Sequence, residues 1–269
     1  MGSIVIVALS FFLLSLAAAL GLPLLCGFSL WWGPAIFVGA ELLCHALFVL
    51  LLWLPIRKVD RSRPLERLEP RGRAGVVAVD RLLCAYGGLR PQLSGLEKLP
   101  KTPYLLVCNH RSFFDPLMLL RWLPEPELAF VSKPSNMRIP MIGDIAYAAG
   151  FLAIDRENDR AALKTILTAA DYLKRGLCSM GIFPEGTRSR TGRLGDFHAG
   201  SFKIAQRAGV PLVIACVRDT EKASRRMFLA PTKVYLDILE VLPAEQVKAM
   251  STRDLAEHSR ALMLQLLGE

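Results

Sequence analysis

Residues 104–115 read YLLVCNHRSFFD, an apolar run followed at once by polar residues. The run Tyr104–Cys108 predicts a buried strand. Asp115-Pro116 then predicts a helix start, with the aspartate as N-cap and the proline at the first helical position. A strand leading into a helix is the repeating unit of α/β proteins, which bind ligands beyond the carboxyl ends of their strands. We therefore expect Asn109 and His110 at the functional edge of a sheet.

The same alternation continues along the chain. Short apolar runs predict further strands at Leu128–Ser132, Phe151–Ile154, Met180–Phe183, Leu212–Val217 and Val234–Val241. Helical periodicity predicts helices at about residues 160–175, 199–208 and 244–267. Asp159 is the expected N-cap of the first of these helices, and Gly176 closes it. The predicted fold is an α/β domain over residues 80–269, with a mixed central sheet flanked by helices.

The beginning of the chain has a different character. Glu41 is the only Asp, Glu, Lys or Arg before Arg57. Two apolar segments, Ile4 to about Leu25 and Leu30 to about Pro55, are each longer than the roughly 20 residues of a membrane-spanning helix. We expect a membrane-anchoring hairpin over residues 1–56 and leave open whether it spans the bilayer or dips into it.

A cleaved signal peptide is the alternative for the first segment, because Ala17, Ala18 and Ala19 resemble a cleavage site. The absence of basic residues ahead of the apolar run disfavours it. Glu41 and His45 lie one helical turn apart in the second segment and can pair there.

Basic residues follow the hairpin. Residues 57–73 contain seven Arg or Lys and three Asp or Glu. We interpret residues 57–79 as a basic linker next to the membrane, and the positive-inside rule then places the following domain in the cytoplasm, at the cell membrane. The net charge of +9 suits an anionic bilayer or a phosphate-bearing substrate. No nucleic-acid motif is present, and no nucleic-acid partner is expected.

The six cysteines form no Cys-x-x-Cys pair. Most of them lie in apolar runs, which is typical of buried free thiols in a reducing compartment. The spacing indicates neither a disulfide framework nor a zinc site.

His110 and Asp115 are candidates for a general-base pair. On a regular helix they would point about 140° apart, so they can meet only if residues 111–114 fold back. The carboxylate would then fix the imidazole tautomer and leave the other nitrogen free to accept a proton. A loop histidine beside a helix-capping aspartate is the structural alternative. Ser112 lacks a nucleophile-elbow context and Cys108 lies within a strand, which disfavours both as nucleophiles.

A second motif, FPEGTRS, occupies residues 183–189 at the end of another predicted strand. Gly186 permits a tight turn, and its backbone N–H groups together with Arg188 can hold a phosphate. Lys133 and Arg156 each follow a predicted strand, so both can converge on the same rim. An ordinary solvated turn and a scattered basic surface are the alternatives.

Four sequence blocks, in this order, resemble the 1-acylglycerol-3-phosphate acyltransferase family across roughly residues 80–245. The blocks are Asn109-His110-x4-Asp115, Gly150–Arg156, Phe183–Ser189 and Val210-Pro211-Leu212-Val213. The phosphate-binding pattern of the family fits Lys133, Gly143 and Arg156, with Asn136 where leucine is usual. The family also implies a two-helix membrane motif ahead of the catalytic domain.

The resemblance implies a role for each candidate residue. His110 would be the general base on the 2-hydroxyl of the acceptor, and Asp115 would orient it. The expected phosphate ligands are Lys133, Arg156 and Arg188, and the residues expected to shape the acceptor site are Glu185, Gly186 and Thr187. No metal and no bound cofactor are implied.

The expected reaction transfers a fatty acyl group to lysophosphatidic acid, giving phosphatidic acid. The donor would be acyl-CoA or acyl carrier protein, which a basic surface does not distinguish. An acyltransferase acting on another lysophospholipid or related O-acyl acceptor is the first alternative. A thioesterase and a non-catalytic lipid-binding protein are the others. Acyl-chain preference and oligomeric state leave no signal in the sequence.

Overall fold

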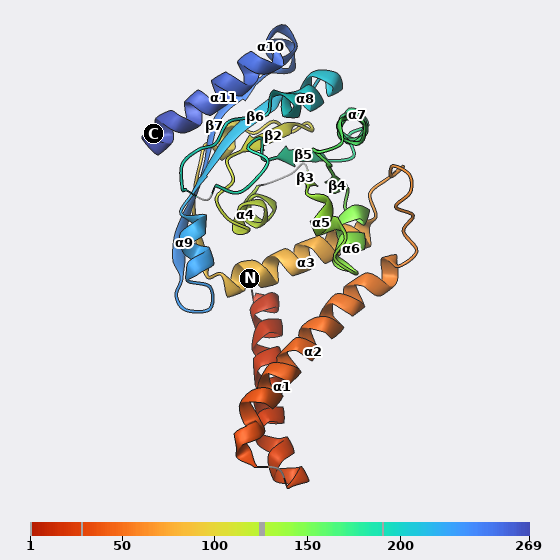
Figure 1. Ribbon diagram of the computed structural model, residues 1–269, viewed down its shortest axis with the longest axis vertical. Helices are drawn as coiled ribbons and strands as arrows, with labels where there is room; N and C mark the ends of the chain where they lie inside the picture. The colour runs from red at the N-terminus through yellow and green to blue at the C-terminus, as the bar shows by residue number, and fades with distance from the viewer. Residues whose placement is uncertain (1, 28, 124–126, 190) are drawn as a thin grey trace.

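Seven strands form one sheet in the order β1-β7-β6-β2-β5-β3-β4 in the computed structural model, which describes residues 2–27, 29–123, 127–189 and 191–269 (Figure 1). The strands are β1 Leu89–Ser94, β2 Leu105–Cys108, β3 Leu128–Ser132, β4 Leu152–Ala153, β5 Ser179–Ile182, β6 Leu212–Arg218 and β7 Thr232–Leu242. All neighbours are parallel except β6 and β7. The predicted mixed sheet is confirmed, and β6, β2, β5, β3 and β4 end at the same edge.

Helices cover both faces of this sheet. The helices of the domain are α3 Pro70–Tyr86, α4 Phe114–Trp122, α5 Pro134–Met137, α6 Ile142–Ala148, α7 Asp159–Lys174, α8 Lys203–Ala208, α9 Thr220–Arg225, α10 Ala244–Ala249 and α11 Thr252–Leu267. Single 3₁₀ turns occupy Leu30–Trp32, Leu54–Ile56, Leu96–Lys98 and Ala199–Phe202. Side chains alternate along each strand. Leu105 and Val107 of β2 therefore pack with α7, α8 and α11, whereas Leu106 and Cys108 pack with α4 and α9 (Figure 1).

Strand β1 was not predicted. Its sequence, LRPQLS, is largely exposed and contains Pro91, so no apolar run marks it. It lies at the edge of the sheet and pairs only with β7. An edge position tolerates proline, since one side of the strand needs no ladder hydrogen bonds.

Two helix predictions are corrected by the structure. The N-cap of α7 is Asn158 rather than Asp159, because the Asn158 side chain accepts from the Ala161 N–H at 3.0 Å. The helix expected over residues 244–267 is two helices. Ser251 begins the second one through a capping box with Asp254, which ends the first at Ala249.

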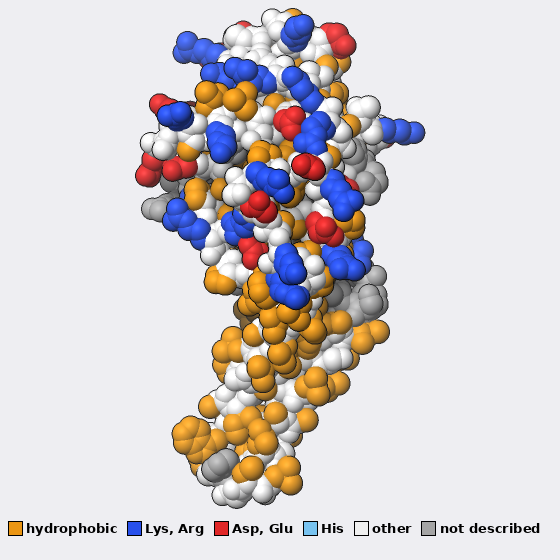
Figure 2. Space-filling model, turned by 90° about the vertical axis from the view of Figure 1, so that its right-hand side faces the viewer, with side chains coloured by type: hydrophobic (Ala, Val, Ile, Leu, Met, Phe, Trp, Pro, Cys, Tyr) orange, Lys and Arg blue, Asp and Glu red, His pale blue; other side chains and the backbone are white. Residues whose placement is uncertain are grey.

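The two apolar segments at the beginning of the chain form helices α1 Gly2–Cys26 and α2 Gly33–Trp53. They pair as a hairpin that projects away from the sheet on the side of α3 (Figure 1). Apolar side chains cover this stalk, whereas charged side chains cover the domain above it (Figure 2). Trp31 is 93% exposed and Leu25 84%. Both helices are long and apolar enough to cross a membrane, as predicted.

Helix α3 joins the hairpin to the domain and begins inside the segment predicted as a linker. Its sequence, PRGRAGVVAVDRLLCAY, starts with small residues and arginines, which gave no apolar periodicity. A Cβ on Gly72 would lie 2.5 Å from Ala148 Cβ, and one on Gly75 would lie 2.8 Å from an Ile145 methyl. These glycines therefore let α3 pack closely on α6.

Polar contacts fix the hairpin to α3 and α6. Glu41 and His45 pair at 3.5 Å, as expected. The other ring nitrogen of His45, Nε2, lies 2.8 Å from the Tyr86 hydroxyl at the end of α3. Trp53 Nε1 donates to Asp144 on α6 at 2.8 Å. Helices α3 and α6 thus each hold α2 through a side-chain hydrogen bond.

Asp80 on α3 is 2% exposed, and among the described residues its one hydrogen-bond donor is the Cys84 thiol, at a long 3.7 Å. Burial raises the pKa of this carboxyl to about 7, although nearby arginines oppose the shift. Its pKa in the unfolded chain is about 4. The folded protein therefore binds the proton more tightly, and stability falls as pH rises from about 4 to about 7.

We expect Asp80→Asn to raise the free energy of unfolding by up to roughly 4 kcal/mol at about pH 8, and by little near pH 4. Denaturant unfolding of the wild type and the variant in detergent, at both pH values, measures this difference. An equal gain at both values would show that the charge of Asp80 is not the cause.

Candidate active site

Loops that follow five parallel strands meet at one edge of the sheet. β2 leads into His110, β5 into residues 183–189, and β6 into Thr220. β3 leads into Lys133 and β4 into the loop that carries Arg156. The site therefore forms where parallel sheets of this kind bind their ligands.

The loop after β2 folds back, so His110 and Asp115 meet. Asp115 Oδ2 lies 2.7 Å from His110 Nδ1, and it also accepts from the Arg111 and Ser112 N–H groups at 2.6 and 2.7 Å. Helix α4 begins at Phe114, so Asp115 lies in its first turn and is not its N-cap as predicted. The carboxylate instead closes the loop onto itself.

Asp115 is fully buried, and both of its oxygens have donors. Oδ1 accepts from the hydroxyls of Ser112 and Thr220. A carboxylate held by this many donors has one orientation, and it therefore fixes the imidazole as well. This geometry favours the tautomer with the proton on Nδ1 of His110.

The second ring nitrogen of His110, Nε2, has no hydrogen-bond partner among the described residues. The ring stacks on Phe183, with centroids 4.1 Å apart and planes 14° apart, and the side chain is 19% exposed. An unpaired Nε2 at an accessible edge can accept a proton from a hydroxyl. The arrangement is thus able to act as a general base.

Glu185 is buried and connects two loops. Its Oε1 accepts from the His110 N–H at 2.7 Å, and its Oε2 accepts from the Gly195 N–H at 2.9 Å. Burial raises the pKa of Glu185, and the two backbone hydrogen bonds partly oppose that shift. The Glu185 side chain therefore positions the His110 loop, in addition to its predicted role of shaping the acceptor site.

Gly186 and Arg156 are brought together. Gly186 has a φ of +77°, and a Cβ built on it would lie 1.5 Å from Arg156 Nη1. The other guanidinium nitrogen donates to the Phe183 carbonyl at 3.4 Å. The His110 ring stacks on the ring of Phe183, so this one residue contacts both Arg156 and the His–Asp pair. Arg156 therefore lies on the predicted rim, and its role as a phosphate ligand stays a prediction.

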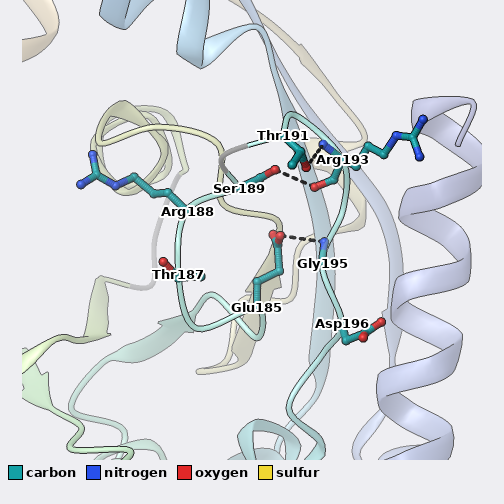
Figure 3. A pocket seen from close by; sticks show the side chains of 8 residues that line it. All are labelled: Glu185, Thr187, Arg188, Ser189, Thr191, Arg193, Gly195 and Asp196. Atoms are coloured by element: carbon teal, nitrogen blue, oxygen red, sulfur yellow. Dashed lines mark hydrogen bonds between the residues drawn. The ribbon is translucent and has the colours of Figure 1, made fainter.

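The remaining candidates lie on exposed loops. Lys133 precedes α5 at the end of β3, and its side chain is exposed. Thr187 and Arg188 are also exposed, and Arg188 extends away from the loop that encloses Glu185 (Figure 3). That loop borders a concavity of about 410 Å³ whose lining includes Glu185, Thr187, Ser189 and Thr191. The convergence of Lys133 and Arg188 on one phosphate stays a prediction.

Residues 90–218 match the family model described as Acyltransferase. The 1-acyl-sn-glycerol-3-phosphate acyltransferase of Salmonella typhimurium is 35% identical over 168 residues, which cover 61% of this chain and 67% of that protein. The Escherichia coli protein of the same name is 32% identical over 165 residues, with the same two coverages of 61% and 67%. This chain belongs to the 1-acyl-sn-glycerol-3-phosphate acyltransferase family.

The fold of this acyltransferase agrees with that assignment. A crystal structure of the 1-acyl-sn-glycerophosphate acyltransferase of Thermotoga maritima superposes with a TM-score of 0.52. It is 21% identical, and the match covers 81% of this chain and 87% of that one. The likeness supports the architecture, and the two apolar helices associate the acyltransferase with a membrane.

Two residues of the acyltransferase site were not assigned a role from sequence. The Asn109 amide donates to the Val217 carbonyl at 2.9 Å and accepts from its N–H at 2.7 Å, so it extends the pairing of β2 with β6 by one step. Thr220 reaches Asp115 from 105 residues away. Asn109 belongs to the sequence block that contains His110, whereas Thr220 lies outside all four sequence blocks.

We expect Thr220→Val to lower kcat of the acyltransferase about tenfold, because a buried carboxylate oxygen loses one donor. Thr220→Ser keeps the hydroxyl and should retain most of the activity. Steady-state assays of the two variants side by side measure this effect. Equal activity of the valine and serine variants would show that the Thr220 hydroxyl does not position Asp115.

Proposed function

We propose that the protein transfers a fatty acyl group from a thioester donor to the 2-hydroxyl of 1-acylglycerol-3-phosphate, forming phosphatidic acid at a membrane. The observation that carries the proposal is the 2.7 Å contact between His110 and Asp115, with His110 Nε2 left without a partner among the described residues. The relatives named above act, by their names, on this acceptor.

The reaction follows from this geometry. His110 Nε2 accepts the proton of the acceptor hydroxyl while that oxygen attacks the thioester carbonyl. Asp115 stabilises the imidazolium that forms. The tetrahedral intermediate then expels the thiolate, which receives the proton from His110. No acyl-enzyme is needed, because a thiolate is a good leaving group and the acceptor oxygen attacks directly.

The acceptor phosphate is bound by basic side chains on the loops around His110. Arg156 is the best placed of these, since it lies against the turn at Gly186 next to Phe183. Lys133 and Arg188 extend from neighbouring loops and complete the phosphate site when the acceptor binds. Thr187 adds a hydroxyl donor at the same turn.

Residues 1–56 anchor the enzyme in the cell membrane. Residues 80–269 form the catalytic domain, on the cytoplasmic side of that membrane. The excess of Arg and Lys over residues 57–73 supports this orientation. The donor is acyl-CoA or acyl carrier protein. Both present a thioester on the same pantetheine arm.

The test is thiol release from a long-chain acyl-CoA by the purified protein in lipid, with and without lysophosphatidic acid. Release that requires the acceptor supports acyl transfer. Release without acceptor would instead identify a thioesterase. Activity with another lysophospholipid but none with lysophosphatidic acid would move the proposal to that acceptor. Lack of release from both acyl-CoA and acyl carrier protein would contradict an acyltransferase.

A further inference from the structure

A loop at the base of the domain exposes two adjacent large apolar side chains. This loop, residues 226–231, joins α9 to β7, and Phe228 and Leu229 at its tip are 70% and 82% exposed. In Figure 1 it is the blue loop below α9, next to the end of α3 and on the side from which the hairpin projects. Apolar side chains on a soluble surface are usually scattered singly, so an exposed pair indicates contact with a partner.

The tip has a fixed orientation. The Phe228 N–H donates to the Tyr86 carbonyl at 3.0 Å, and the Thr232 N–H donates to the Gly88 carbonyl at 3.0 Å. Phe228 has a φ of +65°, a left-handed conformation that bulky side chains disfavour. The domain therefore holds the loop so that Phe228 and Leu229 face outward and do not fold onto the core.

Tyr86 connects this loop to the hairpin. The Phe228 ring lies 5.1 Å from the Tyr86 ring, and the Tyr86 hydroxyl lies 2.8 Å from His45 Nε2 on α2. His45 in turn packs against Phe11 of α1, with ring centroids 5.2 Å apart. Tyr86 thus links the exposed tip to the membrane helices.

The chain around the tip is basic. From Lys222 to Leu236 it contains Lys222, Arg225, Arg226 and Lys233 and no acid. Arg225 and Arg226 are exposed directly beside the tip. Figure 2 shows further Lys and Arg side chains where the domain meets the apolar stalk, on an adjacent face. Basic side chains around apolar ones are typical of surfaces that bind anionic bilayers.

We propose that residues 225–229 form a second membrane contact, separate from the hairpin. Phe228 and Leu229 insert into the interface of the bilayer, and Arg225 and Arg226 contact anionic headgroups. Because the hairpin is fixed to the domain, a second contact beside it sets the tilt of the whole protein relative to the bilayer. Helix α9 begins at Thr220, which donates to Asp115, and ends at Arg225, so the contact also sets how the sheet edge faces the lipid that holds the acceptor.

The test places an environment-sensitive fluorophore on Leu229→Cys in the full chain. The background carries Cys26→Ser and Cys44→Ser, because the other four thiols are buried. Leu163→Cys on α7 is the matched control, since Leu163 is also an exposed leucine, 45% exposed, on a helix away from the hairpin (Figure 1). Both proteins are reconstituted in phosphatidylethanolamine–phosphatidylglycerol vesicles, with and without phospholipids that carry a nitroxide quencher near the headgroup.

We expect the emission from position 229 to shift to shorter wavelength and to be quenched by the nitroxide lipids, with neither change at position 163. Arg225→Glu with Arg226→Glu should reduce the quenching at position 229. Unquenched, water-like emission from position 229 would overturn the proposal. A wavelength shift that nitroxide lipids do not quench, and that disappears on dilution of the protein, would also overturn it by assigning the tip to contact between two copies. Thermal unfolding midpoints close to the wild type confirm that the labelled proteins are folded.

Discussion

Replacement of His110 by alanine is expected to lower kcat for acyl transfer about a thousandfold, within the range of 10²–10⁴ that a general base contributes. The Km for the acceptor should change little, because the imidazole acts on the proton that moves in the transition state and the phosphate ligands remain. The fold should persist, since the His110 backbone N–H still donates to Glu185 and Asp115 keeps its donors from Arg111, Ser112 and Thr220.

The matched control for this variant is His258→Ala. His258 Nε2 lies 2.7 Å from Glu240, the same distance that separates His110 from Asp115. Both side chains of that pair are more than a third exposed, and α11 lies on the face of the sheet opposite α4. Activity should therefore survive the change. Near wild-type turnover by His110→Ala, or equal losses in the two variants, would contradict the general-base role.

Burial determines which parts of the fold could be predicted from the sequence. Parallel strands buried on both faces are continuous apolar runs, so β2, β3, β5 and β6 were evident from sequence. β1 and the first half of α3 have no such pattern. They are stabilised by contacts with partners distant in sequence, namely β7 for the strand and α6 for the helix.

The same distinction holds within the site. His110 and Asp115 are five residues apart, and the structure confirms that they meet. The threonine that donates to the other oxygen of Asp115 is the first residue of α9, which follows β6, and the parallel pairing of β6 with β2 brings it there. This strand pairing was not predicted from the sequence, so Thr220 could not be assigned to the site. The N-cap assigned to Asp115 was wrong for a related reason, because the carboxylate is used by the loop rather than by the helix.

Gly186→Ala is expected to raise the Km for lysophosphatidic acid about 10- to 100-fold. The new methyl group would lie 1.5 Å from Arg156 Nη1 and 2.8 Å from its Cζ, so the guanidinium must leave its place. The side chain is flexible and can move, which allows the variant to fold. A phosphate then loses charge-assisted hydrogen bonds that contribute about 1.5–3 kcal/mol. Steady-state kinetics with varied acceptor at saturating donor measures the effect.

Gly176→Ala separates this effect from backbone strain. Gly176 has a φ of +69°, close to the +77° of Gly186, but no atom lies within 4 Å of a Cβ at that position. Both substitutions should therefore cost about 1–2 kcal/mol of stability for an alanine in left-handed conformation. Only Gly186→Ala should change the Km, and it should have no further effect in an Arg156→Ala background. Equal kinetics for the two glycine variants would mean that the position of Arg156 beside the turn does not matter for binding the acceptor. Additive losses in the double variant would assign the effect of Gly186 to the turn itself, with Arg156 acting independently of it.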